Sequence, residues 1–457
     1  TSGLGGVPGP AGSGTTGGTS GTASTGTTGA GAAGTTGAAP GIAEKGRGWD
    51  ARTVSIGVVT QKDAQRAFET VGVKGLNTGD QEAAAKAVAA ELNRHGGLLG
   101  RRVTLVFRDQ GTVATAQNPT SAGEQACTFF TQDHPVIAVL NPVTLLDVPS
   151  FRSCMAKARV PLLSLSVQGI DAKALTDLAP YYYSGVAPAW DALAPVLVQQ
   201  LQGMGYFTGW NPRTGTAGPN PVRTGLLIPD DVVGHRIVAI LTSRLAQAGQ
   251  KDPVTFFYST ADVANAMPPA VLQFSGNGVT HVLTVNADLL PFQLSASSQG
   301  YRPRYGVTSY GAPQAELESN SPRGQNNGAM GVGWSPSLDV SDGNDPGVTG
   351  RGERDCLALQ KRAGQSFGGK RLAEAVAFAF CDGMQLVGRA AQLGGGFTAP
   401  QLYQGVLRAA STFSPAISFA SALGPNRLFV PGGVRRLAFG QDCSCFRYQS
   451  RTTYRLA

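Results

Sequence analysis

The chain has 457 residues, a formal net charge of +8 at pH 7 and 42% hydrophobic residues, which is enough material for more than one folded domain. Its basic residues occur singly or in pairs and form no stripe interleaved with aromatic residues, so we expect no nucleic-acid partner. The longest apolar runs, such as 136–140, have the length of a strand and are too short to cross a bilayer.

Residues 1–43 contain no charged residue and consist mostly of Gly, Thr, Ser and Ala. This composition offers too little apolar surface to offset the entropy of ordering, and it predicts a flexible tether over residues 1–48. A tether is typical of a protein anchored at the cell surface, as lipoproteins are; a leader without a role is the alternative. Because the chain begins with Thr1, we expect that a targeting segment has been removed or is not part of this sequence.

The folded part is expected to begin near Trp49 with a strand over 54–59, a long loop and a helix over 80–94. In that helix Ala84, Val88 and Leu92 recur at the spacing of one helix face. Strands and helices then alternate, with strands at 103–108, 136–140 and 161–165 and helices at 121–131 and 146–158. The alternation predicts a doubly wound parallel sheet with short connections.

A second series begins at 181–185. We place its strands at 224–228, 254–258, 281–285, 305–308 and 329–333 and its helices at 189–202, 234–248 and 263–274. The stretch 203–221 is rich in Gly, Pro, Asn and Thr and is predicted to be a surface loop. The series predicts a second parallel sheet covered by helices.

From residue 352 the pattern becomes helical, with helices predicted at 352–363, 371–393 and 400–410. We expect these helices to return to the first sheet and 413–457 to return to the second. The predicted N-terminal lobe is therefore 49–184 plus 350–412, and the predicted C-terminal lobe is 185–349 plus 413–457. The expected fold class is α/β, with two doubly wound parallel-sheet lobes joined by a hinge that the chain crosses several times.

An even number of cysteines suggests disulfides, and six allow fifteen pairings; they are Cys127, Cys154, Cys356, Cys381, Cys443 and Cys445. Proximity in the sequence favours pairing them in that order. Disulfides would place the protein outside the cytoplasm. The alternatives are six buried free thiols in a cytosolic protein, and a redox-active Cys-x-Cys at 443–445.

One turn carries a family resemblance. It reads Asn-Arg-His-Gly-Gly-Leu-Leu-Gly-Arg at 93–101 and leads into a strand that ends in Arg-Asp at 108–109. With Arg-Val-Pro-Leu-Leu-Ser at 159–164 and Gly-Tyr-Arg-Pro-Arg-Tyr at 300–305, it resembles the type I periplasmic binding proteins. The nearest branch is that of the branched-chain amino acid/amide receptors among ABC-transporter substrate-binding proteins. The resemblance covers residue 52 to about residue 447.

The resemblance implies an extracytoplasmic receptor, periplasmic or anchored at the cell surface, that closes on a small polar or aromatic solute. It also implies delivery of that solute to the membrane permease of an ABC importer. We expect a monomer without enzymatic activity, cofactor or metal. The alternative is a ligand-sensing or interaction ectodomain of the same fold without a role in transport.

In amino-acid-binding relatives, the turns after the third and fourth strands hold the carboxylate and amine of the ligand. By position these turns match 141–144 and 164–168 here. The candidate ligand-binding residues are Phe68, Asn141, Thr144, Ser164, Ser166, Gln168, Tyr183, Asp230, Asn286, Asp288 and Tyr310. Alternative roles are turn formation or capping for the Asn, Ser and Asp residues, including Asp231, and hinge packing for Tyr183.

One departure bears on the ligand. Relatives that bind α-amino acids supply an acidic residue from the second lobe, but the equivalent stretch, 308–312, contains no carboxylate. We expect Glu316 and Glu318 to lie on the solvent-facing segment that follows. Because burying an ammonium without a counter-charge is costly, Tyr310 favours an aromatic, sugar-like or uncharged ligand.

Signals for catalysis are weak. We identify no nucleophile elbow, no phosphate-binding loop and no His-Glu-x-x-His sequence. The four histidines, His95, His134, His235 and His281, lack the spacing of metal ligands and are expected to be structural or superficial. The glycine pair at 96–97 precedes a strand instead of following one, so it is not a dinucleotide fingerprint.

Overall fold

The computed structural model describes residues 43–70, 74–286, 288–347 and 349–456. The predicted tether lies outside the described residues up to residue 42. Within the described part, no helix is both long enough and apolar enough to span a membrane.

The first sheet has five parallel strands in the order β2-β1-β3-β4-β5. They are β1 (Thr53–Thr60), β2 (Arg102–Asp109), β3 (Val139–Asn141), β4 (Leu162–Ser164) and β5 (Tyr182–Ser184). The assignment of 181–185 to the second series is wrong, because β5 pairs with β4 at the edge of this sheet. Asn141, Ser164 and Ser184 are paired neighbours, so β3, β4 and β5 end level with one another.

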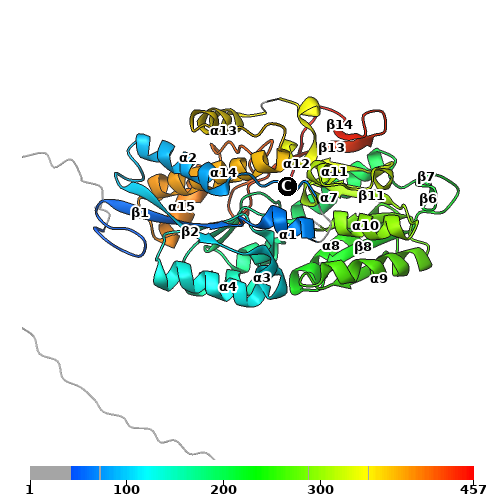
Figure 1. Ribbon diagram of the computed structural model, residues 1–457, viewed down its shortest axis with the longest axis horizontal. Coiled ribbons are helices and arrows are strands. Elements are labelled where there is room, and N and C mark those ends of the chain that lie inside the picture. Colours follow the sequence, from blue (N-terminus) through cyan, green and yellow to red (C-terminus); the bar gives the residue numbers. More distant parts are fainter. Residues whose placement is uncertain (1–42, 71–73, 287, 348, 457) are drawn as a thin grey trace, which may run out of the picture. The chain divides into compact units, whose positions relative to one another are not determined.

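Helices cover both faces of the first sheet (Figure 1). On one face α2 (Gln81–Arg94) contacts α13 (Arg351–Arg362) and α14 (Arg371–Gly394), and α14 contacts α15 (Ala399–Ala409) and β3. On the other face lie α3 (Thr112–Gln117), α4 (Pro119–Thr128) and α5 (Pro149–Lys157). The loop predicted after β1 contains one helix, α1 (Ala64–Thr70).

The second sheet has eight strands in the order β14-β13-β12-β11-β10-β8-β9, with β15 paired to β13. They are β8 (Thr224–Pro229), β9 (Val254–Tyr258), β10 (His281–Thr284), β11 (Arg304–Thr308), β12 (Met330–Gly333), β13 (Gly433–Gly440), β14 (Cys445–Tyr448) and β15 (Tyr454–Arg455). The sheet is mixed, because β13 runs antiparallel to β12 and to β14.

The helices near the second sheet are α7 (Trp190–Gly203), α8 (Val232–Gln247), α9 (Val263–Gly276), α10 (Leu289–Ser298), α11 (Pro313–Glu318) and α12 (Pro336–Asp339). The loop predicted at 203–221 contains a short hairpin of β6 (Trp210–Asn211) and β7 (Thr216–Ala217). The short helix α6 (Ala172–Asp177) lies between β4 and β5. A π-helical turn and four 3-10 turns complete the described elements: Phe129–Asp133, Thr144–Leu146, Ser309–Gly311, Arg323–Asn326 and Asp342–Asn344.

The chain passes between the sheets three times. It leaves the first sheet after β5, returns after β12 to form α13, α14 and α15, and leaves again to form β13 and β14. The predicted lobe boundaries stay a prediction, but an α/β fold with parallel-stranded sheets covered by helices is confirmed.

The predicted disulfides are confirmed as Cys127–Cys154, Cys356–Cys381 and Cys443–Cys445. The first joins α4 to α5, the second joins α13 to α14, and the third lies in the turn between β13 and β14.

Candidate functional site

The carboxyl ends of the strands in the two sheets contact each other directly. The backbone N–H of Gly169, after β4, donates to Oδ1 of Asn286, after β10, at 2.7 Å. Arg236 on α8 forms two hydrogen bonds to Asp171, at the start of α6 (Ala172–Asp177), one of them at 2.8 Å. Ligands of open parallel sheets bind beyond the carboxyl ends of the strands. We therefore take this junction as the candidate site.

A buried carboxylate lies at the first-sheet side of the junction. Asp147 Oδ1 accepts from Arg152 Nε at 2.6 Å. Its Oδ2 accepts from the hydroxyls of Ser164, Tyr182 and Ser166 at 2.5, 2.8 and 3.2 Å. Burial acts to raise the pKa of Asp147, but Arg152 and the hydroxyls outweigh it and hold that pKa below its ordinary value. Asp147 therefore stays ionised in the folded protein.

This network includes two of the predicted ligand-binding residues. Ser164 and Ser166 stand two residues apart and both donate to the chain's own carboxylate. In this structure both hydroxyls donate to Asp147, and their role in binding a ligand stays a prediction.

One nitrogen of the buried Arg152 guanidinium makes no hydrogen bond to the described residues. Its side chain is 6% exposed, and its Nε and Nη2 serve the carboxylate and backbone oxygen of Asp147. The guanidinium also lies 5.1 Å from the centre of the Tyr182 ring. Among the residues that the structure describes, Nη1 has no acceptor. Burial acts to lower the pKa of Arg152, but Asp147, Tyr182 and Asp231 together raise it, so Asp231 of the second-sheet edge acts on this guanidinium electrostatically.

The second-sheet side of the junction carries two carboxyl groups. The hydroxyl of Tyr258 donates to Asp288, and Oε1 of Glu316 accepts from the backbone N–H of Leu290 at 3.0 Å. Burial raises the pKa of Asp288 to about 7 and, together with the neighbouring Asp288, raises that of Glu316. The expectation that Glu316 faces solvent is wrong: α11 turns it inward, and it is buried. Glu318 is exposed, as expected, and accepts from Gln314.

Tyr310 is packed between aromatic side chains. Its ring stacks on Trp190 at 5.3 Å between centroids and meets Trp334 edge-on at 5.1 Å. Its hydroxyl donates to the backbone oxygen of Pro188, which lies where the chain leaves the first sheet. In this structure Tyr310 joins the chain crossings to the second sheet.

Other predicted residues form turns or caps. Asn141 is buried and bonds the backbone of Val143 in both directions. Asp230 is exposed and lies 3.0 Å from His235, while Asp231 caps α8 by accepting from Gly234. These contacts match the turn and capping roles that were the alternatives.

The remaining predicted residues do not join the network. Tyr183 packs against α14 and α15 with Leu386 and Val406, and its buried hydroxyl has no partner among the described residues. Thr144 and Gln168 are half-buried. Phe68 falls within α1, but its side chain lies outside the described part of the chain.

One loop contains the consensus sequences of two catalytic motifs, the nucleophile elbow and the phosphate-binding loop, although neither was expected in this chain. Residues 364–370 read Gly-Gln-Ser-Phe-Gly-Gly-Lys, which contains both Gly-x-Ser-x-Gly and Gly-x-x-x-x-Gly-Lys. Both motifs act where a strand turns into a helix, and a phosphate loop needs Ser or Thr after its Lys. Here the loop joins α13 to α14, and Arg371 follows Lys370. The matches are therefore fortuitous.

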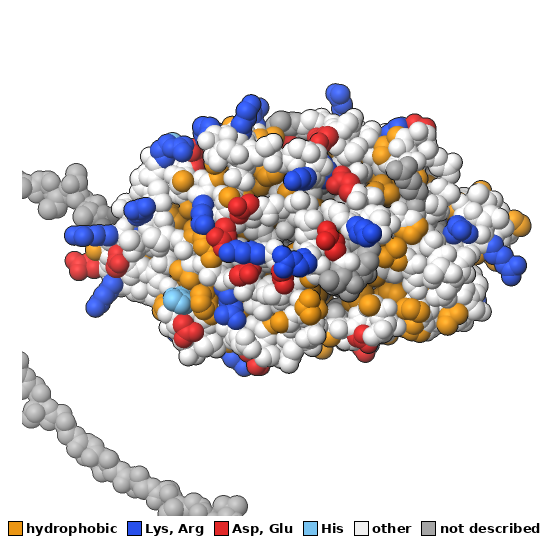
Figure 2. Space-filling view, viewed as in Figure 1, with side chains coloured by type: hydrophobic (Ala, Val, Ile, Leu, Met, Phe, Trp, Pro, Cys, Tyr) orange, Lys and Arg blue, Asp and Glu red, His pale blue; other side chains and the backbone are white. Residues whose placement is uncertain are grey.

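The described side chains and the face shown in Figure 2 bear on metal binding and on the distribution of charge. Among the described residues, no group of three or more His, Cys, Asp or Glu could hold a metal ion. On the face shown in Figure 2, Lys and Arg side chains lie among Asp and Glu side chains.

Comparison with known proteins identifies a family with this fold. The family model for periplasmic binding proteins matches residues 53–429. No curated protein matches the chain.

Three solved structures are similar. A substrate-binding protein from Desulfitobacterium hafniense in complex with Leu has 15% identity and a TM-score of 0.55, over 87% of this chain and 100% of that one. A solute-binding protein from R. palustris in complex with 4-hydroxybenzoate has 14% identity and a TM-score of 0.60, over 88% and 97%. A fatty acid ABC transporter substrate-binding protein from Thermomonospora curvata has 13% identity and a TM-score of 0.59, over 91% and 95%. At these identities the likeness shows a common fold.

Proposed function

The chain belongs to the periplasmic binding protein family, and we propose that it is an extracytoplasmic receptor that binds a small solute between its two sheets and delivers it to an ABC importer. The observation that carries this proposal is the direct contact between the carboxyl edges of the two sheets. The pairs Gly169–Asn286 and Asp171–Arg236 both join groups from opposite edges.

Hinge closure is the mechanism that these contacts support. The chain crosses between the sheets three times, so the two edges can separate by small rotations in the crossing segments. The pairs at Asn286 and Arg236 form only when the edges meet, and they favour the closed arrangement. A solute that binds the closed form more tightly than the open form shifts the equilibrium further toward the closed form. The size of this shift is the difference between the two binding free energies.

We further propose that the solute carries a carboxylate. Arg152 is buried beside the junction and has an unused nitrogen donor, and guanidinium groups prefer planar anions such as carboxylates. Asp147 holds the other side of the guanidinium and so fixes its orientation. Leucine, 4-hydroxybenzoate and fatty acids, named for three proteins of similar fold, all carry a carboxylate.

The opposite edge suits a second polar group on the solute. Asp288 has a pKa raised to about 7 by burial, so near neutral pH its carboxyl group can either accept or donate a hydrogen bond. A hydroxyl or an ammonium at the far end of the solute would find a partner there. The solute class is therefore a small carboxylic acid with a second polar group.

The described chain starts far from this junction. The backbone oxygen of Ala43 accepts from Arg101 at 3.1 Å and from Trp49 at 3.3 Å, next to the amino ends of β1 and β2. We propose that the protein is a monomer held at the membrane through its N-terminal segment. An anchor at the amino ends of the strands would leave the carboxyl edges accessible.

Calorimetric titration of small carboxylic acids into the wild-type chain and into Arg152→Lys tests this function. Lysine keeps the charge beside Asp147 but loses the planar fork, so we expect at least a tenfold loss of affinity for an acid that binds the wild type. Arg362→Lys, at an exposed ion pair with Glu91, is the matched control and should bind as the wild type does. Equal affinity in all three proteins would remove Arg152 from the site.

A further inference from the structure

The three disulfides differ in what they hold together. Cys127–Cys154 and Cys356–Cys381 each tie two helices and span sequence separations of 27 and 25 residues. Cys127, Cys356 and Cys381 are at most 1% exposed. The third bridge, Cys443–Cys445, spans a separation of 2 residues in an exposed turn.

The third bridge is not needed to hold its hairpin. β13 and β14 already pair from Leu437 with Tyr448 to Gly440 with Cys445. A disulfide restricts the unfolded chain less when the loop that it closes is shorter, so this bridge contributes the least of the three by that effect. It also encloses Ser444 at φ +49°, a left-handed conformation that is unfavourable for a residue with a Cβ.

The surroundings of the bridge favour its opening. Cys443 is exposed, whereas Cys445 is 8% exposed. A Cβ atom placed on Gly440 would lie 3.3 Å from Cys443 Sγ and 3.7 Å from Cζ of Arg447, so the guanidinium flanks the same small space as the sulfur. Arg447 also pairs with Asp442 at 2.8 Å. A cation beside Cys443 attracts an incoming thiolate and stabilises the thiolate that Cys443 becomes when it is released in the second step of an exchange.

The inner sulfur has a hydrogen-bond donor of its own. Nδ2 of Asn344 lies 3.1 Å from Cys445 Sγ. An N–H donor at this position would stabilise the thiolate that forms when the S–S bond breaks. The exposed sulfur is thus placed for attack, and the buried one is placed to leave.

We propose that Cys443–Cys445 is a thiol–disulfide exchange site that takes two electrons from a small external dithiol. A thiolate of the dithiol attacks Cys443 Sγ, an S–S bond forms between them, and Cys445 leaves as a thiolate. The second thiol of the reagent, after loss of its proton, attacks the mixed disulfide and releases Cys443 as a thiolate. The reagent ends as a disulfide, and the two cysteines of the protein end reduced.

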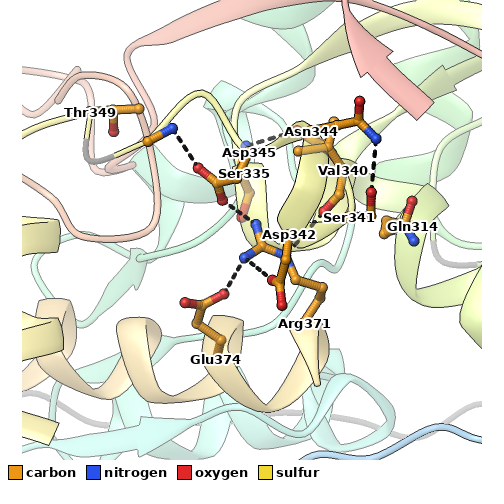
Figure 3. A network of polar contacts seen from close by, with 12 residues as sticks. Gln314, Ser335, Val340, Ser341, Asp342, Asn344, Asp345, Thr349, Arg371 and Glu374 are labelled. Atoms are coloured by element: carbon orange, nitrogen blue, oxygen red, sulfur yellow. Dashed lines mark hydrogen bonds and ion pairs between the residues drawn. The ribbon is translucent and has the colours of Figure 1, made fainter. Parts of the chain in front are cut away.

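The site adjoins a chain crossing between the sheets. Asn344 lies in the turn Asp342–Asn344, and Arg371 of α14 bonds Asp342 at 3.0 Å and Asp345 at 2.5 Å (Figure 3). Glu374 on the same helix completes the set of carboxylates around this guanidinium (Figure 3). Opening of the Cys443–Cys445 bridge therefore alters the contact between Cys445 and Asn344. Asn344 belongs to the segment that leads from the second sheet to the first.

Differential alkylation of the native full chain tests the proposal. The protein is incubated with graded dithiothreitol, trapped with iodoacetamide and analysed by peptide mass spectrometry. We expect Cys443 and Cys445 to become alkylated at dithiothreitol concentrations at least tenfold below those that open the other two bridges. Opening of all three bridges together, or of this one last, would overturn the proposal.

A pair of variants tests the part played by Arg447. In Arg447→Gln we expect the rate of opening by dithiothreitol to fall at least threefold, because the flanking cation is lost. Arg455→Gln changes an exposed arginine of the same sheet and is the matched control. Equal rates in the two variants and the wild type would show that the guanidinium does not assist the exchange.

Discussion

Arg152 Nε donates to Asp147 Oδ1 at 2.6 Å, in an ion pair whose side chains are 6% and 0% exposed. Such a pair contributes little net stability compared with apolar residues of equal volume, because both charges lose their hydration. Removing one partner is costly, because the other charge then stays buried without compensation. The pair orients a guanidinium at the edge where the two sheets meet, and this orientation is the basis of the proposed solute recognition.

Asp147→Asn should therefore unfold more easily than the wild type. We expect a loss of about 3–5 kcal/mol in the free energy of unfolding, measured by urea denaturation, because Arg152 loses its counter-charge. Asp177→Asn removes an exposed partner of Lys173 and should cost no more than about 1 kcal/mol. Equal losses in the two variants would contradict a structural role for the buried pair.

A second buried carboxyl group makes stability depend on pH. Burial raises the pKa of Asp339 to about 7 from an ordinary value of 3.8, although Tyr448, Ser309 and the backbone N–H of Ser335 donate to its Oδ2. Its Oδ1 has no partner among the described residues. Between about pH 4 and pH 7 the unfolded chain releases this proton while the folded chain retains it. The wild type thus loses stability through this group as the pH rises across that window.

Asp339→Asn should remove this loss, because the amide oxygen can accept the same hydrogen bonds without ionising. Relative to the wild type, we expect the variant to gain about 2–4 kcal/mol in stability between pH 5 and pH 8. Thermal unfolding of both proteins at the two pH values measures the gain. A stability difference that does not change with pH would contradict it.

The contacts across the junction should control the balance between open and closed forms. Arg236→Gln removes the partner of Asp171, and we expect the closed population to fall about tenfold relative to the open one, as for loss of a charge-assisted hydrogen bond. Small-angle X-ray scattering should then show a larger radius of gyration. Arg244→Gln, on the exposed side of the same helix, should leave the radius unchanged. A radius unchanged in both variants would contradict the role of the Asp171–Arg236 pair in closure.

Much of the fold follows from local patterns in the sequence. The strand at 254–258 has the predicted bounds. The helix α2 differs from the predicted one by one residue at its start, and α13 differs by one residue at each end. Periodicity locates such elements because each buries only one face or has turn residues at its ends. The helix α10 was missed because Leu289, Leu290 and Phe292 are buried on different sides, and no amphipathic period results.

The candidate site was predicted only in part. Its position at the carboxyl ends of the strands follows from the order of elements, and Ser164 and Ser166 do lie there. Their partner Asp147 comes from a different loop, and Tyr182 comes from a strand that was assigned to the wrong sheet. Contacts between residues so far apart depend on tertiary packing, which local spacing does not encode. The inward turn of Glu316 depends on a helix of six residues, too short to show a period.

The most direct test of solute recognition compares acids with their amides. Thermal unfolding of the native chain is measured with leucine and leucinamide, 4-hydroxybenzoate and 4-hydroxybenzamide, and octanoate and octanamide. A solute at about 100 times its dissociation constant adds roughly 2.7 kcal/mol to the free energy of unfolding, which raises the melting temperature visibly. If Arg152 recognises a carboxylate, at least one acid raises the melting temperature and its amide does not. Equal stabilisation by an acid and its amide, or no stabilisation by any of the acids at millimolar concentration, would contradict this recognition.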